Sequence, residues 1–62
     1  MDIRNYKKMD PVMLMSIINM KIRDEYGDLN NLVAALELDK EALINKLAMA
    51  GFDYLPEAKQ FR

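Results

Sequence analysis

The 62-residue sequence contains no cysteine, no histidine and no tryptophan, and Ser16 is its only serine or threonine. The lack of cysteine excludes disulfides and thiolate metal sites, so a reducing cytoplasm is the expected location. Nucleophilic catalysis has no convincing candidate, because Ser16 falls inside a predicted helix with no general base near it in the sequence. We therefore expect a protein without catalytic activity.

Glycine is also scarce. Gly27 and Gly51 stand alone, so the sequence holds no glycine-rich loop that could cradle a phosphate. Acidic residues gather at Asp24, Glu25 and Asp28, but their spacing differs from that of a calcium-binding EF-hand loop, and helix capping and solvation account for them. The sequence therefore predicts neither a metal site nor a cofactor.

A long apolar run is missing as well. The longest apolar stretch, residues 12–22, is interrupted by Ser16, Asn19 and Lys21, and it is shorter than the roughly 20 residues that span a membrane. We expect a helix of a soluble protein here and no membrane contact. Hydrophobic residues nevertheless make up 52% of a chain that is long enough for one small domain, so some apolar surface is expected to face a partner.

The first helix is predicted over residues 11–26. Asp10 can cap it, Pro11 suits its first position, and Gly27 can end it in the left-handed conformation. At helical spacing its apolar residues form two stripes. The stripe expected to face the rest of the domain contains Met15, Ile18, Ile22 and Tyr26. The remaining stripe contains Met13, Ile17 and Met20.

We expect this remaining stripe to be buried against another surface, because a helix that is apolar on most sides is usually buried on more than one side. We expect Met13, Ile17 and Met20 to form a self-association surface, for which an isologous homodimer is the commonest arrangement. An unidentified protein partner is a second option. As a third option, the methionines fill gaps in a small core.

Residues 28–51 predict a helix–turn–helix pair, with helices over residues 29–37 and 40–50. Each segment begins at an aspartate and repeats apolar residues at helical spacing. The expected fold class is therefore mainly α, a three-helix domain containing a helix–turn–helix pair.

The two ends of the chain are predicted separately. The aromatic residues Phe52, Tyr54 and Phe61 lie in a C-terminal segment, residues 52–62, that predicts either a small β-hairpin (a wing) or an irregular tail laid on the helices. At the N-terminus a short extended arm is expected around Tyr6.

The apolar framework of the helix–turn–helix pair resembles that of bacterial helix–turn–helix regulators. The resemblance raises nucleic-acid binding, for which the candidate contacts are Lys40, Asn45 and Lys46 in the pair and the short N-terminal basic run Arg4, Lys7 and Lys8. However, Val33 and Glu37 stand where those regulators usually carry a small residue and a glycine. The face that would meet DNA carries Asp39 and Glu41, and a net charge of −1 with a pI of about 5.2 lacks the expected basic footprint. Nucleic-acid binding is therefore kept as the alternative.

Three motifs resemble a family of short bacterial proteins of unknown function. They are the Asp-Pro-Val-Met-Leu-x-Ser segment that begins at Asp10, the later Gly51-Phe52-x-Tyr54, and the ending Gln60-Phe61-Arg62. The resemblance covers nearly the whole chain and implies a bacterial, cytosolic, stand-alone small domain, with no activity or ligand attached.

The second half of the chain also resembles the small helical subdomain at the start of a bacterial initiation factor, so a translation-associated module is a third hypothesis. Our leading hypothesis is a homodimeric protein-interaction module.

Overall fold

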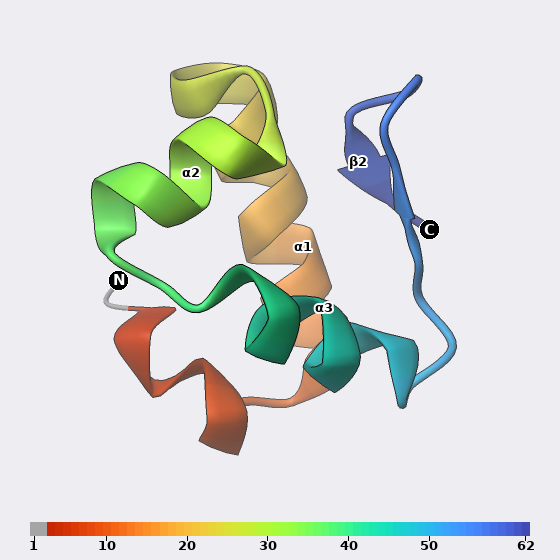
Figure 1. Ribbon diagram of the computed structural model, residues 1–62. Coiled ribbons are helices and arrows are strands. Elements are labelled where there is room, and N and C mark those ends of the chain that lie inside the picture. The colour runs from red at the N-terminus through yellow and green to blue at the C-terminus, as the bar shows by residue number, and fades with distance from the viewer. Residues whose placement is uncertain (1–2) are drawn as a thin grey trace.

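The computed structural model describes residues 3–62, with side chains from Asn5 onward. In chain order the elements are a 3₁₀-helix η1 (Ile3–Lys8), α1 (Pro11–Lys21), a π-helical turn η2 (Ile22–Tyr26), α2 (Leu29–Leu36), α3 (Lys40–Ala48), β1 (Tyr54–Leu55) and β2 (Gln60–Phe61). Figure 1 shows α1 between α2 and the C-terminal hairpin, with α3 and η1 toward its N-terminal end. The predicted fold class, mainly α with a small C-terminal β-hairpin, is confirmed.

An aspartate caps the N-terminus of each α-helix. Asp10, Asp28 and Asp39 each accept a hydrogen bond from the backbone N–H three residues later, at 3.0, 2.8 and 3.2 Å. These bonds satisfy N–H groups that have no partner inside the helix. Between α2 and α3 the chain turns at Glu37, whose φ of 56° lies in the left-handed region that favours glycine.

The first helical segment changes its winding before it ends. The sequence predicts one helix over residues 11–26, whereas α1 stops at Lys21 and the wider turn η2 continues to Tyr26. The N–H of Gly27 donates to the Ile22 carbonyl at 2.7 Å, which closes this π-helical turn. Gly27 itself has a φ of 83°, so the chain leaves the helix at the expected residue.

The hydrophobic core is assembled from every helical element and from β2. Its buried residues are Tyr6, Leu14, Ile18, Ile22, Leu29, Leu32, Val33, Leu43, Leu47 and Phe61. Two predictions were wrong here. Ile18 and Ile22 are buried as predicted, but Leu14 is fully buried while Met15 is only half-buried, so the inner side of α1 is centred nearer to Leu14 than the predicted stripe. Tyr6 is buried in η1 because its ring fills the core, so the N-terminal segment is not an extended arm.

The hairpin is fixed to the helices by hydrogen bonds to both of its strands. On β2, the Phe61 N–H donates to the Asn19 Oδ1 at 2.8 Å, and the Asn19 Nδ2 donates to the Phe61 carbonyl at 3.0 Å. On β1, the Tyr54 hydroxyl accepts a hydrogen bond from the Leu29 N–H at 3.3 Å, and the Tyr54 and Phe61 rings are 5.2 Å apart. The C-terminal segment is therefore a hairpin and an integral part of the core, not an irregular tail.

Candidate interaction surface

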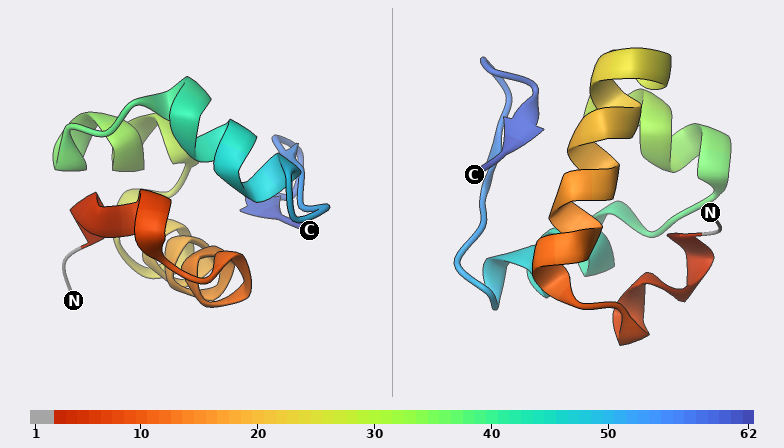
Figure 2. Two further views of the ribbon diagram at one scale, coloured as in Figure 1. Left: turned by 90° about the horizontal axis from the view of Figure 1, so that it is seen from below. Right: turned by 180° about the vertical axis from the view of Figure 1, so that it is seen from behind.

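The outward face of α1 is apolar and uncovered. Val12, Met13 and Met20 are 54%, 51% and 46% exposed, and the exposed Ser16 lies between them. In the view from behind in Figure 2, α1 lies in front and no other described element passes across it. The hairpin, α2 and α3 pack against its other sides, which leaves this face free to meet another molecule.

The predicted self-association residues lie on or beside this face. Met13 and Met20 are about half exposed, while Ile17 is half-buried and packs against the core. Val12 was not predicted, although its spacing of eight residues from Met20 places both on the same side of a helix. We therefore define the α1 face as Val12, Met13, Ser16 and Met20. Its role in self-association stays a prediction.

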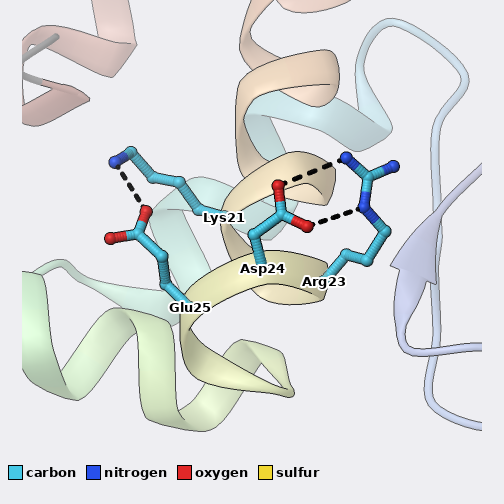
Figure 3. Close-up of polar contacts among 4 residues, drawn as sticks. All are labelled: Lys21, Arg23, Asp24 and Glu25. Atoms are coloured by element: carbon cyan, nitrogen blue, oxygen red, sulfur yellow. Dashed lines mark hydrogen bonds and ion pairs between the residues drawn. The ribbon is translucent and has the colours of Figure 1, made fainter.

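Charged residues form two ion pairs at the junction of α1 and η2, and the pairs extend to different sides of the helix (Figure 3). The Arg23 guanidinium lies 2.9 and 3.3 Å from the two carboxylate oxygens of Asp24, and the Lys21 Nζ lies 3.3 Å from the Glu25 Oε2. The hydrogen bond from Arg23 lowers the pKa of Asp24 from its ordinary value, so this carboxylate is ionised at neutral pH. Because both carboxylates are about half exposed to solvent, they can exchange partners at little cost.

Lysines gather at the other end of α1. The Lys46 Nζ donates to the Lys7 carbonyl at 3.1 Å, and the neighbouring Lys8 is exposed. A shallow cleft of about 400 Å³ lies here, lined by Lys7, Pro11, Lys46, Met49 and Ala50. Two of the candidate nucleic-acid contacts, Lys7 and Lys46, are thus brought together from segments 39 residues apart.

The remaining candidate nucleic-acid contacts are scattered. Lys40 lies at the opposite end of α3 from Lys46, and its Nζ donates to the Asn30 side chain at 2.6 Å. Asn45 is exposed on α3, and the side chain of Arg4 lies outside the described residues. The structure therefore offers a small basic patch rather than a continuous basic face.

A second cleft, of about 470 Å³, lies between α2, α3 and the hairpin. Its lining residues are Asp28, Asn30, Lys40, Ile44, Asp53, Tyr54, Pro56 and Lys59. Several polar groups of this cleft already bind the chain itself: Asp28 caps α2, Lys40 binds Asn30, and the Tyr54 hydroxyl receives the Leu29 N–H. These groups hold the hairpin and the helices together.

Two further kinds of feature are absent from residues 3–62. No group of three or more acidic or histidine side chains is arranged to hold a metal ion. None of the helices in this part of the chain has the length and apolar character that crossing a membrane requires.

Comparison with known proteins identifies a family but no characterised relative. Neither the curated proteins nor the solved structures gave a match. A family described as a domain of unknown function, DUF4250, matches residues 8–61. This range includes all three α-helices and the hairpin, together with all but Arg62 of the motifs that resemble short proteins of unknown function. The chain therefore belongs to the DUF4250 family of domains of unknown function.

Proposed function

We propose that this protein is a homodimeric protein-interaction module without catalytic activity, and that it self-associates through the α1 face. The observation that carries the proposal is the exposure of Val12, Met13 and Met20, each about half open to solvent on one side of one helix. Clustered apolar side chains of this kind typically mark an interaction site on a small soluble domain. Methionine suits such a surface because its flexible side chain adapts to the partner.

A second copy of the chain is the simplest partner. Homodimers with two-fold symmetry are the commonest oligomers, and they need only one self-complementary surface. The lack of catalytic activity is proposed from the residue types: the only serine, Ser16, is exposed in the middle of an apolar face, and no histidine or cysteine is available to activate it.

The first prediction concerns self-association. Sedimentation at micromolar concentration is expected to give a dimer for the natural chain, whereas Met20→Lys is expected to give a folded monomer. Met20 is 46% exposed, so the lysine can reach solvent in the monomer but would place a charge in the dimer interface. Ile17→Asp is a poorer test, because Ile17 also packs against the core.

The matched control is Leu55→Lys, which introduces the same charge at an exposed apolar residue of the hairpin. This variant is expected to remain dimeric. A natural chain that stays folded and monomeric throughout the micromolar range would refute the proposed function.

The alternative function is nucleic-acid binding, and it is favoured by the meeting of Lys7 and Lys46 at one end of the molecule. Against it, Asp39 and Glu41 are exposed at the start of α3, and the net charge is −1. Affinity for nucleic acid depends largely on the number of phosphates that lysine and arginine neutralise. We therefore keep the homodimer as the leading proposal.

The second prediction concerns DNA. Fluorescence anisotropy with a generic duplex is expected to give a Kd on the order of 10⁻⁴ M or weaker at physiological salt, as for nonspecific contacts. A titration repeated at several salt concentrations provides the measurement. Submicromolar binding that weakens steeply with salt would instead favour a nucleic-acid-binding protein.

A further inference from the structure

We propose that two copies of this chain pair with their α1 helices antiparallel and with the two-fold axis passing beside Ser16. This inference rests on the proposed function, because it assigns a geometry to the same α1 face. Ser16 is the middle residue of α1, which runs from Pro11 to Lys21. Val12 and Met20 lie four residues before and after it, so the face is laid out symmetrically about Ser16.

The sizes of these side chains favour the antiparallel arrangement. With antiparallel helices, Val12 of each copy faces Met20 of the other, so a short side chain meets a long one twice. With parallel helices, two valines would meet at one level and two methionines at another, and the helices would have to diverge to fit them. Interiors pack densely, so the evenly filled arrangement is preferred.

Ser16 has a small side chain at the point where the two helices would be closest. Helices pack with their axes about 8–10 Å apart, and small residues at the contact allow the lower value. At the proposed axis Ser16 would face its own counterpart. Close approach at this point brings Val12 and Met20 into contact on either side, because four residues correspond to about 6 Å along a helix.

The charges at the two ends of α1 also favour the antiparallel arrangement. The exposed Lys7 and Lys8 lie at the N-terminal end, while the C-terminal end carries the exposed Asp24 and Glu25 together with their ion-pair partners Arg23 and Lys21. Antiparallel pairing brings the lysines of each copy close to the carboxylates of the other, whereas parallel pairing brings lysines together. The helix dipoles also oppose one another favourably when the helices are antiparallel.

The surface area that a stable dimer buries requires contacts at the two ends of α1 as well. A typical stable interface buries about 800 Å² on each partner, which is about a fifth of the 4156 Å² surface of the described chain. Three half-exposed side chains on one helix are too few to supply this area. The contact would therefore extend along α1 to its ends, where the antiparallel arrangement brings Lys7 and Lys8 of one copy to the carboxylates of the other.

Cysteine cross-linking tests the geometry, because the natural chain contains no cysteine. The variants Val12→Cys and Met20→Cys are mixed in equal amounts, oxidised gently and analysed by intact mass, which separates the three disulfide dimers. Disulfides require Cα atoms about 4.4–6.8 Å apart, so they report direct opposition. The antiparallel arrangement is expected to give the mixed disulfide well above the share found for the same mixture in denaturant.

The outcomes separate the two proposals. Predominance of the two unmixed disulfides would overturn the antiparallel arrangement while leaving the homodimer intact, and so would a mixed disulfide at only the denaturant share. The same preparations are sedimented under reducing conditions beside the natural chain. A natural chain that is monomeric there refutes the proposed function itself.

Charge exchange provides an independent test of the same arrangement. Lys8→Glu is expected to weaken the dimer roughly two- to tenfold at low salt, because each of two exposed pairs contributes little. The double variant Lys8→Glu with Asp24→Lys is expected to recover the natural affinity, since the opposite charges face each other again. Failure of the second change to restore affinity would contradict the antiparallel pairing.

Discussion

Truncation of the chain after Leu55 is expected to leave little folded protein at 25 °C. The truncation removes Phe61, which is 1% exposed and packs in the core beside Tyr54. Loss of a buried phenylalanine side chain costs about 3–5 kcal/mol, which is close to the roughly 3–5 kcal/mol that a single core of this size supplies. The paired hydrogen bonds between Asn19 and Phe61 are lost as well.

Thermal melts followed by circular dichroism measure this effect. Phe61→Ala in the full-length chain isolates the contribution of the ring, and Glu57→Ala, at an exposed position in the hairpin turn, is the matched control and should melt like the natural chain. Equal midpoints for the truncated and full-length chains would contradict the prediction. That result would mean that Gln60, Phe61 and Arg62 are kept for binding a partner and not for stability.

The second large effect is expected from Leu14→Ala. Leu14 is completely buried, so its truncation should lower the free energy of unfolding by about 2–5 kcal/mol. Met15→Ala is the matched control on the next residue of the same helix. Met15 is only half-buried, so its truncation should cost about 1 kcal/mol, near the average for point mutants.

Urea denaturation at 25 °C gives both values from the shift of the midpoint at constant slope. The comparison tests the orientation of α1, because the sequence predicted Met15 on the inner stripe and the structure places Leu14 there. A larger loss of stability for Met15→Ala than for Leu14→Ala would restore the predicted orientation. It would also shift the outward face of α1 from Val12 toward Ile17, with Met20 still exposed.

Local features of the fold were readable from the sequence alone. Asp10, Asp28 and Asp39 each cap a helix through a backbone N–H only three residues away, so the interaction depends on no distant part of the chain. Gly27 and Gly51 take the positive φ values expected just after a helix. Capping and glycine conformation depend on only a few neighbouring residues, so they can be predicted without knowledge of the tertiary structure.

The orientation of α1 could not be read in this way. Apolar residues surround this helix on most sides, so its pattern does not distinguish Leu14 from Met15 as the residue that faces inward. The fit against α2, α3 and the hairpin decides between them. The same fit leaves Val12 and Met20 exposed, so it also determines the candidate interaction surface.

The sequence by itself determined the number of α-helices, their capped beginnings and the aromatic content of the hairpin, because these depend on neighbours along the chain. Only the tertiary structure decided that Asn19 would bind the Phe61 backbone, 42 residues away, and that Lys46 would meet Lys7. It also decided which side of α1 stays open. Those outcomes depend on how the elements fill a shared core, and side-chain packing between distant segments leaves no periodic signal in the sequence.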